Sequence, residues 1–172
     1  MTGQGRSDKQ DRTTHARNTK MAGASNKPTL VLIPGSFSPS SLYSEVSSRL
    51  EAKGFQIIVG DLPTTGRSPP APAATMREDA GYFHDLVSGI ADEGKDVVLL
   101  AHSYGGIVAN QSAKGILKTD RTALGKRGGV VRIVFLAAFV PQVGQSLQDC
   151  VGAGDGDPGL MNVDVGVSLG RT

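Results

Sequence analysis

The stretch Val97-Val98-Leu99-Leu100-Ala101-His102-Ser103-Tyr104-Gly105-Gly106 decides the fold. A short apolar run stops at a small residue, a serine lies between two bulky residues, and two glycines follow. The pattern predicts a buried strand that turns sharply into a helix, with Ser103 at the apex. The serine backbone is strained in such a turn. The residues two before and two after it must therefore be small, as Ala101 and Gly105 are.

This spacing is that of the nucleophile elbow, G-x-S-x-G, with Ala101 in the place of the first glycine. The elbow exposes the serine hydroxyl above the end of a strand, where it can attack a substrate. The alternative is a tight turn whose serine only caps the helix. The apolar strand before Ser103 favours the elbow, and so do the apolar residues that continue after it at helical spacing, which are Ile107, Val108, Ala109, Ala113, Ile116 and Leu117.

Apolar strands and amphipathic helices alternate along the chain. The strands are expected at residues 29–33, 55–59, 97–101 and 130–140, and the helices at 41–53, 75–92 and from the elbow to about 118. This alternation predicts a parallel sheet built from right-handed crossovers, and nearly continuous apolar strands indicate that both faces are covered. The fold class is therefore α/β, a three-layer sandwich with a mostly parallel sheet.

Two of the helices have distinct signals. Leu42, Val46 and Leu50 follow one another at four-residue steps, which predicts a buried face on helix 41–53. Thr75 and Glu78 form a capping-box pattern at the start of the next helix. The face of that helix is expected to comprise Met76, Ala80, Phe83, Val87 and Ile90.

Composition limits the class of protein. A chain of 172 residues suits one domain. Residues 1–27 carry six Lys or Arg against two Asp, so the net charge of +2 arises in this tail and indicates no nucleic-acid surface on the domain. The single cysteine, Cys150, fits a reducing compartment, and no apolar run is long enough for a membrane span or a secretory signal. We expect a cytoplasmic protein without a membrane partner.

Three regions follow from these patterns. Residues 1–27 are expected to be a disordered basic tail, with Met21 as a second candidate start. Residues 28–150 hold the strands and helices. Residues 151–172 are glycine-rich, and we expect them to be a disordered segment at the start of a cap region.

With these pieces in order, the chain resembles the α/β-hydrolase superfamily and, within it, the branch of hydroxynitrile lyases and plant methyl esterases. The resemblance covers about residues 29–150. Four stretches carry it. Residues 30–37 resemble the family's strand and oxyanion loop, and residues 61–68 resemble its Asp-x-Pro loop. Residues 101–106 match the elbow, and residues 135–141 are similar to the strand that leads into the cap. Pro34 stands where the family usually has a histidine.

The resemblance implies a role for several residues. Ser103 would be the nucleophile that attacks an ester carbonyl carbon. The backbone N–H groups of Tyr104 and of Ser36 (or Phe37) would form the oxyanion hole. Asp149 is a weak candidate for the catalytic acid, and its alternative is a solvated loop carboxylate.

The histidine of the family's triad has no counterpart at its expected place. The family's chain order is nucleophile, acid, histidine, whereas the histidines here are His15, His84 and His102. The chain therefore resembles the N-terminal two-thirds of such a hydrolase, a C-terminally truncated and incomplete α/β-hydrolase fold. As given, it is expected to be nearly inactive.

The sequence predicts a carboxylesterase-like serine hydrolase of small esters, with a small-molecule ester as its partner and with neither cofactor nor metal. Two alternatives stay open, a hydroxynitrile-lyase-type enzyme and a non-catalytic ligand-binding protein on the same fold. A dinucleotide-binding fold is disfavoured because the turn at Gly35 lacks G-x-G-x-x-G. The sequence sets neither the substrate nor the oligomeric state.

Overall fold

The structure is a computed structural model, and it describes residues 27–150. The two expected disordered segments, 1–27 and 151–172, lie outside the described residues except for Lys27. Within residues 27–150, no helix combines the length and the apolar character needed to cross a membrane.

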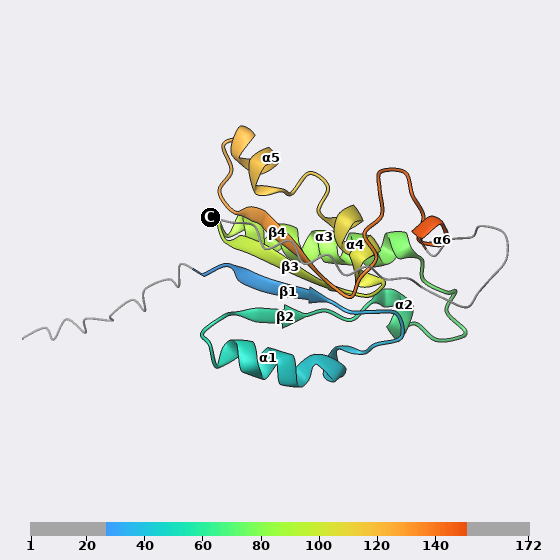
Figure 1. Cartoon of the computed structure of the whole chain (residues 1–172). Helices are drawn as coiled ribbons and strands as arrows, with labels where there is room; N and C mark the ends of the chain where they lie inside the picture. The colour runs from blue at the N-terminus through green and yellow to red at the C-terminus, as the bar shows by residue number, and fades with distance from the viewer. Residues whose placement is uncertain (1–26, 151–172) are drawn as a thin grey trace, which may run out of the picture.

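Four parallel strands form one sheet in the order β2-β1-β3-β4 (Figure 1). The α/β class with a parallel sheet, predicted from the alternating pattern, is confirmed. The strands are β1 (Thr29–Ile33), β2 (Ile57–Val59), β3 (Asp96–His102) and β4 (Gly129–Leu136). The last strand ends four residues earlier than its apolar run suggests, because Ala137 has a φ of 43° and turns the chain out of the sheet.

The long central helix begins where the sequence places it. The Thr75 hydroxyl accepts a hydrogen bond from the Glu78 N–H, and the Glu78 carboxylate accepts one from the Thr75 N–H, so the capping box is confirmed. The elbow helix ends earlier than about residue 118, and a separate short helix follows it. The helices are η1 (Ser40–Tyr43), α1 (Ser44–Glu51), α2 (Pro63–Gly66), α3 (Met76–Asp92), α4 (Gly105–Ser112), α5 (Lys118–Ala123) and α6 (Leu147–Cys150).

The strand order fixes which helices share a face of the sheet. The connection from β1 leads to β2 on one side, while the connections from β2 to β3 and from β3 to β4 run the opposite way. Right-handed crossovers in opposite directions place their helices on opposite faces. Accordingly, α1 lies on one side of the sheet, and α3 and α4 lie on the other (Figure 1).

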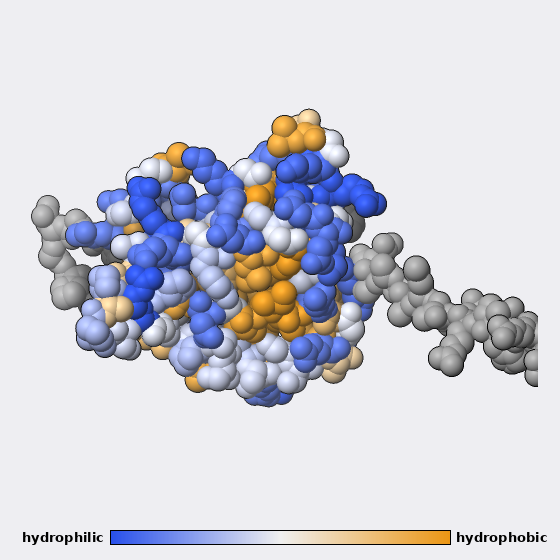
Figure 2. Space-filling model, turned by 180° about the vertical axis from the view of Figure 1, so that it is seen from behind, coloured by the Kyte–Doolittle hydropathy of each residue, from blue (hydrophilic) through white to orange (hydrophobic). Residues whose placement is uncertain are grey.

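The core lies between the sheet and the pair α3 and α4. Side chains from β1 and β3 point to this face, and Phe83 of α3 and Val108 of α4 are fully buried against them. These core residues are not exposed, so they are distinct from the hydrophobic area that lies near the middle of the surface in the view from behind, bordered by hydrophilic residues (Figure 2). The sheet residues of this core include Val31, Ile33, Val97, Leu99 and Ala101.

The opposite face of β3 and β4 is less covered. Leu100 and Val134 are register partners on this face and are only half-buried, and Leu136 is 41% exposed. Of the described crossover helices, only α1 lies on this side. Parallel sheets are ordinarily covered on both faces, so this apolar surface is a departure from the usual arrangement.

The helix predicted at residues 41–53 is present as η1 and α1, but the burial expected for its apolar residues is wrong. Leu42 is 69% exposed and Val46 is 44% exposed, and α1 has no buried residue. Leu42 lies in η1, a 3₁₀ turn, where three residues rather than 3.6 complete each turn. Four-residue spacing therefore does not place Leu42 on the same face as Val46 and Leu50.

Candidate active site

The strand order creates a topological switch point at the carboxyl ends of β1 and β3. These strands are neighbours, but the chain leaves β1 toward the α1 face and leaves β3 toward the α4 face. In open α/β sheets, ligands bind at such a switch point, outside the carboxyl ends of the strands. The loop after β1 carries Gly35 and Ser36, and the turn after β3 carries Ser103.

Ser103 has the strained backbone of a nucleophile elbow. It lies between the end of β3 at His102 and the start of α4 at Gly105, and its φ is 52°. A positive φ is uncommon for a residue with a side chain, and the surrounding structure must hold it in place. The Ser103 carbonyl oxygen accepts hydrogen bonds from the N–H groups of Gly106 and Phe139, each at 3.1 Å. The half-buried Ser103 hydroxyl hydrogen-bonds to no described residue.

The glycines around the elbow are required by close packing. A Cβ atom on Gly105 would lie 2.5 Å from the Ile33 carbonyl oxygen, and one on Gly106 would overlap the Phe139 carbonyl oxygen. A Cβ on Gly35 would lie 3.1 Å from the Ser103 Cβ. The absence of side chains at these positions therefore brings the loop after β1 directly against Ser103.

The two predicted oxyanion donors are available for a ligand. Tyr104 lies at the N-cap of α4, and Ser36 lies in the exposed loop beside the elbow. Neither backbone N–H donates to a group within residues 27–150, and the same holds for Phe37, whose φ is 58°. Unpaired N–H groups next to a strained serine are what an oxyanion hole requires. The N-terminal end of α4 also favours negative charge there.

His102 holds the loop after β1 rather than the serine. Its Nδ1 lies 2.8 Å from the Tyr43 hydroxyl, and that hydroxyl accepts a hydrogen bond from the Gly35 N–H at 3.1 Å. The Tyr43 and His102 rings meet edge to face with their centroids 5.8 Å apart. This network ties η1, the loop and the end of β3 together, and it leaves His102 without a contact to the Ser103 hydroxyl.

The other histidines have different surroundings. His84, on α3, places its Nδ1 2.9 Å from the Ser112 carbonyl oxygen on α4. His15 lies outside the described residues. No histidine of residues 27–150 therefore bonds to Ser103.

A buried carboxylate near the elbow was missed by the sequence analysis. Asp79 of α3 is fully buried and accepts hydrogen bonds from the Tyr104 hydroxyl at 2.9 Å and from the Thr64 N–H and hydroxyl at 2.9 and 2.8 Å. Burial and the bond to Asp79 raise the pKa of the Tyr104 phenol, which stays neutral. The available signal was a carboxylate on the core-facing stripe of α3, three residues after Met76 and four before Phe83.

Asp149 makes the contacts of a helix cap. On α6, its carboxylate accepts hydrogen bonds from the Ser146 N–H and hydroxyl, both at 2.7 Å, while its own N–H donates to the Ser146 hydroxyl. These bonds lower the pKa of the Asp149 carboxyl. The side chain is exposed and has no histidine partner among residues 27–150.

The chain matches a known protein family in sequence. The model described as "Alpha/beta hydrolase family" matches residues 30–168. Among curated proteins, the chain is 37% identical over 144 residues to "Probable hydrolase R7" of a Phoma species, covering 80% of this chain and 56% of that protein. It is 28% identical over 120 residues to "Methylesterase 7" of Arabidopsis thaliana, covering 69% and 42% of the two chains.

The solved structures agree with the sequence relatives. An extracellular α/β-hydrolase from a Paenibacillus species superposes with a TM-score of 0.55 and 28% identity, covering 74% of this chain and 47% of that one. Its description reports structural and functional homology to tobacco salicylic acid binding protein 2. The chain spans about half the length of the curated relatives it matches.

Proposed function

The chain belongs to the α/β hydrolase family, and from that premise we propose that it is a carboxylesterase-type serine hydrolase whose nucleophile is Ser103. One observation carries the proposal. The strained Ser103 backbone, with a φ of 52°, lies at the switch point of the sheet beside the N–H groups of Ser36 and Tyr104, which donate to no group within residues 27–150. A hydrolytic nucleophile and its oxyanion donors need this combination.

The chemistry follows from these groups. The Ser103 Oγ attacks the ester carbonyl carbon, and the carbonyl oxygen becomes an oxyanion that accepts hydrogen bonds from the Tyr104 and Ser36 N–H groups. The alcohol leaves with a proton, and water then releases the acid from the acyl-enzyme. We assign no general base within residues 27–150, because neither described histidine bonds to the Ser103 hydroxyl.

We propose small carboxylic esters as the substrate class. Support comes from the relative named methylesterase and from the description of the Paenibacillus hydrolase. Both names concern those proteins, and both are consistent with a carbonyl group bound in front of Ser103. The loop after β1, in which Phe37 is 88% exposed, lies against Ser103 and would border such a ligand.

A second candidate function is ligand binding without turnover. It is favoured by one observation, the engagement of His102 with Tyr43 and of His84 with Ser112, which leaves the Ser103 hydroxyl without a basic partner in residues 27–150. An elbow and an oxyanion hole alone retain only a small part of a triad's rate acceleration. Such a protein would bind an ester or ketone at the same switch point.

A fluorophosphonate probe tests the proposal. We expect covalent labelling at Ser103 that disappears in Ser103→Ala and persists in the control Ser48→Ala, which changes an exposed serine on α1. Equal labelling of Ser103→Ala and the native chain would overturn the assignment of the nucleophile. Absence of labelling, together with a raised Tm in the presence of a small ester, would replace hydrolysis with the binding function.

A further inference from the structure

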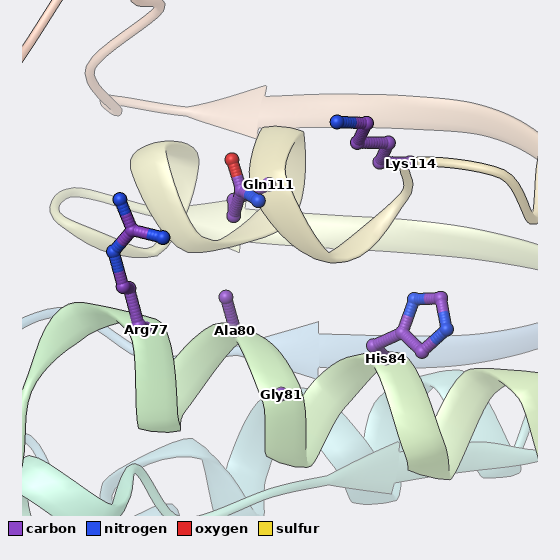
Figure 3. A pocket seen from close by; sticks show the side chains of 6 residues that line it. All are labelled: Arg77, Ala80, Gly81, His84, Gln111 and Lys114. Carbon is purple, nitrogen blue, oxygen red and sulfur yellow. The ribbon is translucent and has the colours of Figure 1, made fainter.

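A groove between α3 and α4 lies apart from the elbow. It encloses about 330 Å³ and is lined by residues of α3, by Gln111 of α4 and by Lys114 in the turn that follows α4 (Figure 3). Its floor on α3 consists of small residues, whereas its rim is polar and basic. The lining residues are Arg77, Ala80, Gly81, His84, Gln111 and Lys114.

The charges of the groove have one sign. Arg77 and Lys114 line it, and neither forms an ion pair or a side-chain hydrogen bond with any residue in the described range 27–150. No carboxylate is among the lining residues. Of the acidic groups on α3 nearest the groove, Glu78 pairs with Arg67 and Asp79 bonds to Tyr104, while the exposed Asp85 follows the lining residue His84 and is not itself part of the lining. Two cations that face one cavity attract an anion into it.

Two further groups complete the set of polar contacts. The His84 Nδ1 faces the Ser112 carbonyl oxygen, which only accepts, so Nδ1 carries the proton of this hydrogen bond. The Nε2 on the other side of the neutral ring is then an acceptor, so the donors for an anion come from the other lining groups. The Gln111 amide adds N–H donors from α4. A planar guanidinium, an ammonium and an amide together match the oxygens of a carboxylate or a phosphate.

The floor of the groove is open at Gly81. A Cβ atom built there would meet no heavy atom within 4 Å, so packing does not require a glycine at this position. Glycine in the interior of a helix is less favourable than alanine. Its presence in the middle of α3, one turn after Arg77, leaves open space for ligand atoms at the floor of the groove.

We propose that this groove between α3 and α4 is a binding site for an oxyanion, the carboxylate or phosphate group of a small molecule, held by Arg77, Lys114 and Gln111. The site is separate from the switch point at Ser103, and its occupancy does not depend on the proposed hydrolysis. The shared chemistry is a compact anion with at least two oxygens. Comparing the binding of phosphate with that of acetate distinguishes a phosphorylated ligand from a carboxylated one.

The test is a titration of the full ¹⁵N-labelled chain, at constant ionic strength, with inorganic phosphate and separately with acetate. We expect saturable shifts of the Gly81, Gln111 and Lys114 amides with at least one of them. Saturation by phosphate alone assigns a phosphorylated ligand, and saturation by acetate alone assigns a carboxylated one. Shifts that rise linearly with both anions would overturn the proposal.

Matched variants separate a built site from general attraction. Arg77→Gln and Lys114→Gln should each weaken binding about tenfold, because each removes one charge-assisted contact. Lys126→Gln removes the same charge at an exposed position outside the groove and should leave the affinity unchanged. Equal weakening by Lys126→Gln would refute the site.

A variant that supplies its own anion gives an independent check. Gly81→Glu places a carboxylate in the open space one turn from Arg77, where it competes with the ligand. We expect it to abolish the saturable shifts, while Gly81→Ala keeps them. Both variants should fold, since the position has no close neighbours and α3 is otherwise intact. Retained binding by Gly81→Glu would contradict the proposal.

Discussion

At the scale of single residues, the elbow shows how steric demands make a motif predictable. Small residues are needed around Ser103 because strand, helix and neighbouring loops pass within van der Waals contact, and the spacing in the sequence records that need. The Asp79 carboxylate was not found in the same way, because the donors that satisfy it, on Thr64 and Tyr104, come from distant parts of the chain. A buried carboxylate of this kind can be recognised only when the groups that donate hydrogen bonds to it are known.

The glycine requirement can be measured. Gly106→Ala should lower the free energy of unfolding by about 1–3 kcal/mol, because the new methyl group overlaps the Phe139 carbonyl oxygen and forces the backbone to shift. Gly89→Ala is the matched control, since a Cβ there meets nothing within 4 Å. It should raise the stability by roughly 0.5–1 kcal/mol. Urea denaturation of both variants gives the comparison, and an unaltered midpoint for Gly106→Ala would contradict the close approach.

At the scale of elements, capping residues and apolar periodicity predicted a helix correctly where the tertiary contacts favour the same arrangement. The helix α3 has a capping box at Thr75 and an apolar stripe that packs on the sheet, and both were readable from its residues. The burial of the helix expected at residues 41–53 was misjudged, because the change from the 3₁₀ turn η1 to α1 rotates Leu42 away from the face that carries Val46 and Leu50. Such a change depends on the loop after β1, which periodicity cannot register.

The start of α3 should be sensitive to acid. Hydrogen bonds from Arg67 and Thr75 lower the pKa of Glu78 below its ordinary 4.5, so the charged carboxylate favours the folded chain. This stabilisation is complete above the unfolded pKa and is lost as the pH falls through the lower, folded value. Chemical denaturation between pH 6 and pH 3 should therefore show a smaller acid-induced loss in Glu78→Gln than in the native chain. Identical pH profiles would show that the cap carries no net stabilisation.

At the scale of the whole molecule, the sheet has unequal sides. The core beneath α3 and α4 is closed, while the other face of β3 and β4 presents Leu100, Val134 and Leu136 with only α1 among the described crossover helices on that side. The sequence predicted the strands, since buried apolar runs are conspicuous. It could not predict this asymmetry, because strand order and the direction of each crossover decide which helices lie on which face.

The partly covered face should promote self-association. Leu136→Lys replaces a side chain that is 41% exposed, so it should reduce concentration-dependent association with little effect on the unfolding midpoint. Sedimentation velocity over a range of concentrations measures this. The control Leu124→Lys changes a more exposed leucine, 72% accessible, at the end of α5. If both variants associate like the native chain, the face does not mediate contacts between molecules.

The hydrogen bond from the Phe139 N–H to the Ser103 carbonyl oxygen links the turn after β3 to the segment that leaves β4. A single amide in that segment is thus a reporter of the serine's geometry, placed where no catalytic group needs to be altered. Its rate of deuterium uptake follows how often the Ser103 turn leaves its strained conformation. The backbone conformation of Ser103 can thereby be monitored by solvent exchange at Phe139, thirty-six positions further along the chain.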